Sequence, residues 1–328
     1  MTDQAYAMAA RRPGGSDMFH KVAIATLPEP GPGQVRIRHT AVGVNFLDVY
    51  YRGGSYPWPV EADLVTGSEG AGVVEAVGAG VTGFAVGQRV AYTTPNGAYA
   101  THRLLDAALL VPLPDDIPDE IAAAVMLKGL TAHYLLHHSF PVEAGQTVLF
   151  HAAAGGVGLI AGQWLAAKGV RAIGTAGGPE KCALALQNGY EAVIDYRAQD
   201  FVAEVGRLTG GKGVAAVYDS VGADTIMGSL DALERFGTLV SFGQSSGTPD
   251  QLKIKDLTRG SLRVTRPTLF HHVARRDWLL QAAADLFGMI RSGRIVIRID
   301  RSLPLQEVAE AHDGLEGRRT TGSTVLIP

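Results

Sequence analysis

Cysteine is nearly absent from this sequence, which has one, Cys182, among 328 residues. A single cysteine cannot form an internal disulfide, so a disulfide framework is excluded. It also excludes any metal site that needs several thiolate ligands within one chain.

Long apolar runs and an excess of one charge are also missing. No run of about 18 apolar residues suggests a membrane span, and residues 1–19 have no apolar stretch behind a basic segment, as a secretory signal would. The formal net charge is −3, which gives nucleic acid no basic stripe to bind. We therefore expect a cytoplasmic protein, with neither a membrane nor a nucleic acid as partner.

Apolar residues make up 46% of the chain and charged residues 19%, which is typical of a globular protein with a large core. At 328 residues, two domains are expected. Up to about residue 125, short strand candidates at 34–38, 70–78 and 87–92 are separated by glycine and proline, as in a barrel or sandwich. Residues 112–118 are proline-rich and precede an alanine-rich helix that starts near Asp119.

From about residue 128 to 266, strands and helices alternate. This alternation predicts a parallel, doubly wound sheet. The expected strands are 147–151, 170–175, 192–196, 214–219, 238–242 and 262–266, and the expected helices are 159–168, 179–189, 200–209 and 224–236.

The last part, 267–328, contains one strongly amphipathic helix around Trp278–Ile290, ended by Ser292 and Gly293. Strands are expected at 295–299 and 324–327, with a helix at 305–316 between them. We expect this part to pack back on the first domain. The predicted domains are therefore 1–127 together with 267–328, and 128–266.

A glycine-rich turn joins the first strand of the alternating region to its helix. The pattern is Ala153-x-Gly155-x-x-Gly158, in which alanine stands at the first position of G-x-G-x-x-G. Glycines allow the backbone to approach a pyrophosphate, and the free N–H groups at the helix start attract its charge. The alternative is a turn between a buried strand and a buried helix that has no ligand.

Five segments together resemble quinone oxidoreductases of the zeta-crystallin type, in the medium-chain dehydrogenase/reductase superfamily. The segments are Gly43–Tyr50, Leu127–Thr131, His151–Gly158, Tyr218–Gly222 and Val264–Pro267. The resemblance covers nearly the whole chain and is greatest to the bacterial NADPH:quinone reductases. It implies an α/β protein with a GroES-like β-rich domain, a Rossmann-type cofactor domain and a homodimer.

The zinc alcohol dehydrogenases of the same superfamily carry a Gly-His-Glu stretch and an upstream cysteine in the first domain. This chain has Gly67-Ser-Glu-Gly70 at the matching place and no cysteine in that domain. A catalytic zinc with Cys and His ligands cannot be built in that way, so no metal is expected.

The end of the second strand indicates which cofactor is preferred. NAD enzymes usually place Asp or Glu there, about 20 residues beyond the glycine turn, whereas residues 173–179 are small and neutral. Lys181 and Tyr196 provide a cation and a phenol for an additional 2′-phosphate, although Lys181 alone fits a solvated helix lysine equally well. In the resembling family the matching residues contact that phosphate, so NADPH is the expected cofactor.

The resemblance also assigns further site residues. As catalytic residues it implies Asn45, Tyr50, Tyr56 and Lys128. As cofactor-binding residues it implies Phe46, Asp48, Tyr134, Ala154, Gly155, Gly156, Val157, Gly158, Gly177, Lys181, Tyr196, Ser220, Val221, Phe242, Gly243, Gln244, Pro267, Leu269 and Arg318. Each has an ordinary structural alternative: Asn45 at a turn, Tyr50 in the core, Lys128 in a structural ion pair.

These features predict a zinc-independent reductase that passes a hydride from NADPH to a quinone or a related conjugated carbonyl compound. An enone or 2-alkenal double-bond reductase is the alternative within enzymes. The alternative outside enzymes is a zeta-crystallin-like RNA-binding or structural role. The net negative charge argues against binding to RNA.

Overall fold

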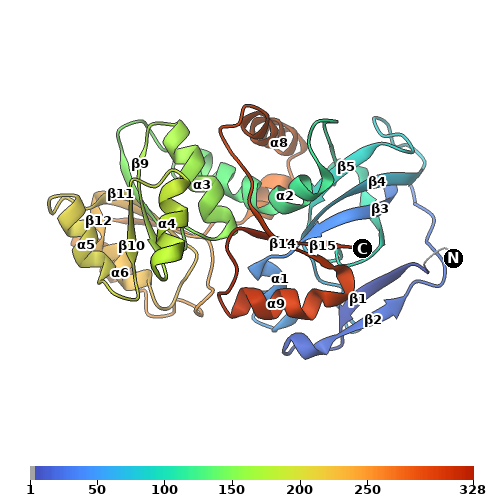
Figure 1. Ribbon diagram of the computed structural model, residues 1–328, viewed down its shortest axis with the longest axis horizontal. Helices are drawn as coiled ribbons and strands as arrows, with labels where there is room; N and C mark the ends of the chain where they lie inside the picture. Colours follow the sequence, from blue (N-terminus) through green and yellow to red (C-terminus); the bar gives the residue numbers. More distant parts are fainter. Residues whose placement is uncertain (1–3) are drawn as a thin grey trace. The chain divides into compact units, whose positions relative to one another are not determined.

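The computed structural model describes residues 4–328 of the chain, which form two compact units (Figure 1). Unit 1 extends to Leu130 and also contains Phe270–Arg291 and Ile297–Pro328. Unit 2 contains Thr131–Leu269 and Ser292–Val296. The short segment 292–296 thus lies with unit 2, whereas the sequence analysis assigned it to the first domain.

Unit 2 is built on a six-stranded parallel sheet in the order β10-β9-β8-β11-β12-β13. The chain starts in the middle at β8, moves outward to β10, then returns to β11 and continues to the other edge. This is the doubly wound order, and the direction reverses between β8 and β11. The strands are β8 (Thr147–Phe150), β9 (Arg171–Ala176), β10 (Ala192–Asp195), β11 (Val214–Asp219), β12 (Leu233–Ser241) and β13 (Arg263–Thr265).

Four helices connect these strands, and local sequence explains where they begin. Pro179 is the first residue of α4 (Pro179–Gln187), where its fixed φ suits a helix start. Asp200 caps α5 (Phe201–Leu208) by accepting the backbone N–H groups of Val202 and Ala203. Helix α3 (Gly156–Ala167) packs beside α4, and α5 packs beside α6 (Ile226–Asp231) (Figure 1).

Unit 1 contains a seven-stranded mixed sheet in the order β14-β15-β3-β4-β5-β7, with β6 also paired to β3. The last strand of the chain, β15, lies parallel to β14 and antiparallel to β3, so segments from both ends of the sequence share one sheet. The strands are β3 (Gln34–Gly43), β4 (Glu69–Val77), β5 (Arg89–Thr93), β6 (His102–Asp106), β7 (Val111–Pro112), β14 (Ile299–Pro304) and β15 (Ser323–Ile327). A separate hairpin is formed by β1 (Tyr6–Ala10) and β2 (Phe19–Ala23).

The core of unit 1 draws on both ends of the chain, with Ile37 and Tyr92 from the first part and Val308 and Leu326 from the last. One face of α8 is buried, as its periodicity predicts, through Trp278, Leu279, Ala282, Ala283, Leu286 and Phe287. The remaining helices are α1 (Phe46–Arg52), α2 (Asp119–Tyr134), α7 (Leu269–Val273), α8 (Arg276–Arg291) and α9 (Val308–Glu316), with shorter turns at Ser16–Met18, Ala107–Leu109, Leu135–Ser139, Ile254–Arg259 and Leu305–Glu307. Within residues 4–328 no helix combines the length and apolar character needed to cross a bilayer.

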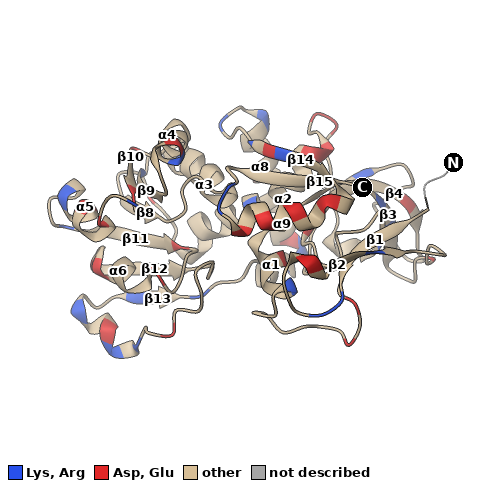
Figure 2. Cartoon of the chain, turned by 60° about the horizontal axis from the view of Figure 1, so that its bottom comes forward, with Lys and Arg blue, Asp and Glu red and all other residues tan. Residues whose placement is uncertain are grey.

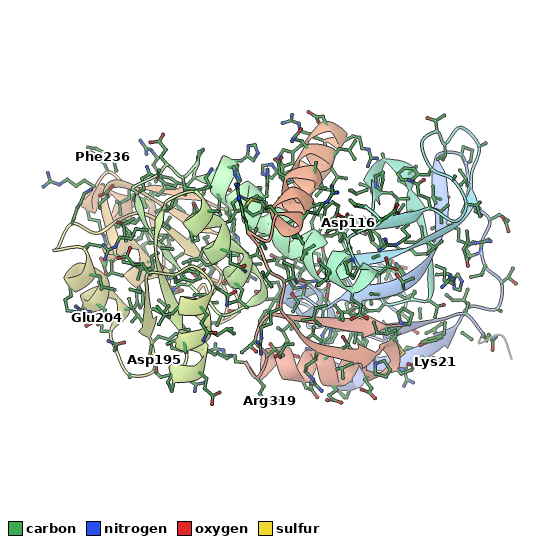
Figure 3. All side chains as sticks on the ribbon, turned by 45° about the horizontal axis from the view of Figure 1, so that its top comes forward. Lys21, Asp116, Asp195, Glu204, Phe236 and Arg319 are labelled. Atoms are coloured by element: carbon green, nitrogen blue, oxygen red, sulfur yellow. The ribbon has the colours of Figure 1, made fainter. Side chains whose placement is uncertain are left out.

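Two predicted elements are wrong in extent. The helix expected at 224–236 ends at Asp231, and β12 begins at Leu233. Phe236, within this strand, adopts a φ of +64° and is 63% exposed (Figure 3). A bulky residue rarely adopts the left-handed region. The local sequence therefore could not predict that a strand with this kink begins before Phe236.

The strand expected at 295–299 instead begins at Ile299. Residues before it are held by a side chain: the amide of Gln163 on α3 donates to the carbonyl of Val296 and accepts its N–H. Because this one amide satisfies both backbone groups of Val296, the segment needs no strand partner there.

Candidate functional site

The glycine turn lies at the end of β8, next to the point where the strand order reverses. Ala152 has a φ of +54°, and Gly155 is the N-cap of α3. The first turn of α3 carries no acidic residue, so the positive end of the helix is not neutralised by its own side chains. This edge of the sheet is where doubly wound folds bind their ligands.

The two glycines of the turn, Gly155 and Gly158, differ in the space around them. A Cβ atom on Gly158 would lie 2.4 Å from the carbonyl oxygen of Ala152, so this glycine is required by close packing of the turn against the helix. A Cβ on Gly155 would meet its nearest atom, the same oxygen, at 3.2 Å. The fold therefore tolerates a side chain at Gly155 better than at Gly158. A side chain at Gly155 would mainly occupy the space next to the turn, where a ligand would approach.

Next to this turn, a chain of buried hydrogen bonds connects His151, the residue after β8, with β9, β11 and α6. His151 Nδ1 is 2.9 Å from Thr175 Oγ1, and His151 Nε2 is 3.0 Å from Ser229 Oγ. The Ser229 hydroxyl donates to Asp219 Oδ2 at 2.7 Å. Because the serine proton goes to the carboxylate, His151 must donate from Nε2 and accept at Nδ1. Burial lowers the pKa of His151, in agreement with a neutral ring.

Asp219, the last residue of β11, also shapes the loop that follows it. Its Oδ1 accepts the backbone N–H groups of Val221 and Gly222 at 2.8 and 3.0 Å. The loop after β12 approaches closely, because a Cβ on Gly243 would lie 2.6 Å from the carbonyl oxygen of Ser220. Ser220, Val221 and Gly243 are thus brought together.

Arg266 holds the second of these loops in place. Its guanidinium donates to the carbonyl oxygens of Ser241 and Gly243 at 3.1 and 2.9 Å and to the side chain of Gln244 at 3.1 Å. The ring of Phe242 packs against Phe150 of β8, with ring centroids 5.7 Å apart. The candidate loop residues therefore have fixed positions relative to the sheet.

At the end of β9, Tyr196 and Arg197 lie over the glycine pair 177–178. A Cβ on Gly177 would meet the Tyr196 hydroxyl at 2.5 Å and Arg197 Nε at 3.2 Å. Asp195 (Figure 3) accepts the N–H groups of Gly178 and Arg197, and these bonds lower the pKa of its carboxyl. Lys181 lies in the first turn of α4, so this strand end carries two cations and a phenol.

In unit 1, Asn45 and Asp48 lie at the start of α1 and are buried. The N–H of Asn45 donates to Asp48 Oδ2 at 2.9 Å, as in a capping box. Asp48 also accepts the hydroxyls of Ser68 at 2.5 Å and Tyr99 at 2.8 Å. Burial raises the pKa of Asp48 to about 6, opposed by these hydrogen bonds. Asp48 is fully buried, so its contacts in this structure are with the protein.

Glu69 connects two of the predicted catalytic residues. Its Oε1 accepts the side-chain amide of Asn45 at 2.9 Å and forms an ion pair with the ammonium group of Lys128. Its Oε2 accepts the N–H of Leu127 at 2.6 Å. Asn45 and Lys128 are therefore joined through a carboxylate that is fully buried.

Four aromatic rings gather around α1 and the loop after it. Ring centroids of Tyr50 and Tyr56 are 5.3 Å apart, and those of Phe46 and Tyr50 are 6.2 Å apart. Tyr51 packs edge-on against Tyr56 at 5.5 Å. Phe46, Tyr50 and Tyr56 are only partly buried, so they form an aromatic wall with an accessible side.

Comparison with known proteins agrees with this architecture. A family model described as the alcohol dehydrogenase GroES-like domain matches residues 31–115, and one described as zinc-binding dehydrogenase matches residues 156–284. The chain is 52% identical over 303 residues to a quinone oxidoreductase of Pseudomonas aeruginosa, covering 92% of this chain and 93% of that protein. The chain belongs to the quinone oxidoreductase family.

Two further relatives define this membership. A 2-haloacrylate reductase of Burkholderia sp is 44% identical over 332 residues, covering 98% of each chain. The solved structure of Escherichia coli quinone oxidoreductase complexed with NADPH is similar with a TM-score of 0.95 and 42% identity, over 98% of this chain and 100% of that one. The predicted fold class, a GroES-like domain with a Rossmann-type domain, is confirmed.

Some residues assigned through the quinone oxidoreductase resemblance lie apart from these clusters. Tyr134 is the buried last residue of α2, Pro267 follows β13, and Leu269 begins α7. Arg318 follows α9 in unit 1 with a φ of +54°, whereas Lys181 and Tyr196 belong to unit 2. Their roles in binding the cofactor stay predictions.

Sequence reasoning did not single out Glu69, His151, Asp219 or Arg266 as site residues. His151 and Glu69 lie inside motifs that were quoted, and Asp219 ends a predicted strand, so a polar residue in an apolar segment was the available signal. Arg266 also lies inside a quoted segment and a predicted strand, but its role was hidden because its partners belong to a loop more than 20 residues earlier in the sequence.

Ser68 stands where the zinc alcohol dehydrogenases carry the histidine of their Gly-His-Glu stretch. Ser68 donates its hydroxyl to Asp48 and is fully buried. Within residues 4–328, no three side chains of His, Cys, Asp or Glu come close enough together to hold a metal ion.

Proposed function

We propose that this protein is an NADPH-dependent quinone reductase that works without zinc. The observation that carries the proposal is the 52% identity to a quinone oxidoreductase over 92% of the chain. The glycine turn at the strand reversal and the cationic end of β9 support it from the chain itself.

NADPH fits the groups that the chain presents in unit 2. The N-terminus of α3, with Ala154 to Gly158, would hold the pyrophosphate, because the first N–H groups of a helix have no intrahelical partner and Gly155 adds no side chain to the approach. Lys181 and Tyr196, next to Gly177, would hold the 2′-phosphate. Ser220, Val221, Phe242, Gly243 and Gln244 belong to loops at the same edge of the sheet and would line the cofactor.

When bound, NADPH supplies the hydride for the reaction. The protein's part is to orient the acceptor and to stabilise the negative charge that develops on its oxygen. We assign the orienting role to the aromatic wall of Phe46, Tyr50 and Tyr56 and the donor role to the amide of Asn45. A quinone forms a weakly basic hydroquinone anion, so a positioned hydrogen bond serves where an alkoxide would need a strong acid.

NADPH oxidation in the presence of a benzoquinone, followed by absorbance, tests this function. We expect turnover with NADPH to exceed turnover with NADH. An enzyme that binds NADPH and oxidises it with none of a panel of quinones and enals would contradict the proposal.

A second acceptor class has its own support, because a 2-haloacrylate reductase is 44% identical over 98% of the chain. Both acceptors are conjugated, but a haloacrylate receives the hydride at carbon of a double bond. Comparing kcat/KM for a benzoquinone, an enal and a 2-haloacrylate ranks the three classes.

Three further properties belong to this proposal. Zinc independence predicts less than one zinc per chain in pure protein and activity that resists chelation.

A homodimer is supported by β13, which ends the described sheet of unit 2 and offers its outer edge to a second copy. The molar mass in solution tests it. We place the enzyme in the cytoplasm, where NADPH is regenerated, and cell fractionation tests that location.

A further inference from the structure

Glu69 is a fully buried charge of unit 1 with three polar partners, Asn45, Leu127 and Lys128. Its carboxylate is fully buried, the side chain of Lys128 is 7% exposed, and together they bring β4, α1 and α2 into one hydrogen-bonded group. Burying an ion pair is favourable only when further hydrogen bonds satisfy it. Here the amide of Asn45 and the N–H of Leu127 provide them.

The neighbouring strand is built to admit this side chain. Gly43 on β3 faces Glu69 across the sheet. A Cβ on Gly43 would lie 2.4 Å from Glu69 Oε1 and 2.6 Å from its Cγ. The same Cβ would lie 2.3 Å from the carbonyl oxygen of Ala123 in α2, so a glycine at this position makes room for both α2 and the carboxylate of Glu69.

The chemistry of a carboxylate fixes how the Asn45 amide faces. An ionised carboxylate only accepts hydrogen bonds, so Asn45 must present its nitrogen to Glu69 and cannot turn its oxygen there. The backbone of Asn45 is fixed independently, since its N–H donates to Asp48 and its carbonyl accepts the N–H of Asp48 at 3.0 Å. With one amide proton committed to Glu69, the second has a defined direction.

We propose that Glu69 is a positioning residue that orients the amide of Asn45 toward the acceptor, and that Lys128 is its buried counter-charge. This inference rests on the proposed function, because the amide of Asn45 is there the group that meets the acceptor oxygen. It gives Lys128 an indirect role in place of a direct proton donor.

Glu69→Gln tests the orientation with almost no change in shape. Glutamine has one oxygen. When that oxygen stays on the N–H of Leu127, the NH₂ group faces Asn45 and allows the Asn45 amide to turn over. The ammonium of Lys128 lies beside the same Oε1 and opposes this turn, so the full effect is expected when Lys128 is also replaced by methionine. A hydrogen bond to a charged group contributes about 1.5–3 kcal/mol, so we expect kcat/KM for the quinone to fall about ten- to a hundredfold. The Kd for NADPH, measured by fluorescence titration, should change less than about twofold, since no part of this group lies in unit 2.

A double-mutant cycle separates positioning from general damage. If Glu69 acts through Asn45, Glu69→Gln in an Asn45→Ala background should change kcat/KM less than about twofold. Equal losses in both backgrounds would overturn the proposal. Glu75→Gln is the matched control, because Glu75 lies on the same strand and pairs with Arg36, Arg38 and His102 away from Asn45; its kinetics should equal those of the parent.

Glu69→Gln leaves the ammonium of Lys128 buried without its partner, which destabilises the fold, so the variant Glu69→Gln with Lys128→Met removes both charges. We expect this double variant to fold and to retain the loss in kcat/KM. Recovery of parental kcat/KM would overturn the proposal.

An NMR measurement on the free protein distinguishes this inference from the proposed function. The side-chain amide signals of Asn45, assigned by their absence in Asn45→Ala, should shift and lose exchange protection in Glu69→Gln and in the Lys128→Met double variant. Unchanged signals would overturn the role of Glu69, even in an active quinone reductase. Shifted signals in a protein that reduces no quinone would instead refute the proposed function.

Discussion

At the scale of single residues, the phenol of Tyr50 is one of two in the aromatic wall, with the Tyr56 ring 5.3 Å away. Because a hydroquinone anion needs no strong acid, we predict that Tyr50→Phe lowers kcat by about tenfold or less, whereas loss of a well-aimed donor costs roughly 100–1,000-fold. Steady-state kinetics at saturating NADPH measures this effect. Complete loss of turnover with normal NADPH binding would make Tyr50 an obligate proton donor.

Lys181 carries the second residue-scale prediction. A charge-assisted hydrogen bond to the 2′-phosphate is worth about 1.5–3 kcal/mol, so Lys181→Ala should weaken NADPH binding about ten- to a hundredfold and spare NADH. Arg197, next to Gly177 and Gly178, retains part of the positive charge. Lys212→Ala is the control, since Lys212 pairs with Glu234 and is 77% exposed. Equal losses for both cofactors would indicate a structural lysine.

Some residue roles can be predicted from neighbouring residues in the sequence, whereas others depend on partners far away in the sequence. The glycine turn and Lys181 could be proposed from the sequence because their neighbours in sequence define them. Glu69 was not, because its partners Asn45 and Lys128 lie 24 and 59 residues away. The burial of Asp48 behind Ser68 and Tyr99 was equally hidden, since hydrogen bonds across 20 and 51 residues leave no periodic pattern.

At the scale of elements, the strand–turn–helix unit from β8 to α3 gives a paired test. Gly158→Ala places a Cβ 2.4 Å from the carbonyl oxygen of Ala152, so it should lower the unfolding temperature. Gly155→Val meets its nearest atom at 3.2 Å and should mainly abolish NADPH binding by obstructing the pyrophosphate. Thermal unfolding and NADPH titration of both variants measure the contrast. Normal NADPH affinity in Gly155→Val would refute the phosphate assignment.

Helices and strands could be predicted from the sequence where capping or turn residues and hydrophobic periodicity agree. Pro179 and Asp200 mark two helix starts that the structure reproduces, and α8 buries its apolar face. The prediction of a helix up to Phe236 was wrong, because the apolar residues at its end suit a helix and a strand alike. Sheet pairing decided the matter there, through Leu233 opposite Val214.

At the scale of the whole molecule, buried titratable groups set the dependence of stability on pH. Burial lowers the pKa of His39 and of His312 from 6.5 to about 3. Below pH 6.5 the unfolded chain binds these protons and the folded one does not, so each histidine costs about 1.4 kcal/mol of unfolding free energy per pH unit. Asp48 acts oppositely: its pKa is raised to about 6, so stability increases as pH falls from 6 to 3.8.

Between pH 6 and 3.8, two histidines oppose one carboxyl, so we predict a net loss of about 1.4 kcal/mol per pH unit from these three groups. Urea unfolding of the parent and of His312→Phe, at pH 7 and pH 5, measures it. The variant should lose less stability on acidification than the parent, by about 2 kcal/mol. Parallel pH profiles would show that His312 is not buried in its neutral form.

The position of β15 has a consequence for biosynthesis. Its partner β3 is translated about 280 residues earlier, and at roughly 5–20 residues per second the ribosome needs about 15–55 seconds to supply β15. All six strands of unit 2 emerge in that interval. Nascent unit 2 can therefore fold while the end of β3, at Val42 and Gly43, still lacks its partner. The rest of that edge is already paired with β6, from Gln34 to Arg38. During this delay only the short end of β3 is open to chaperones and to strands of neighbouring nascent chains.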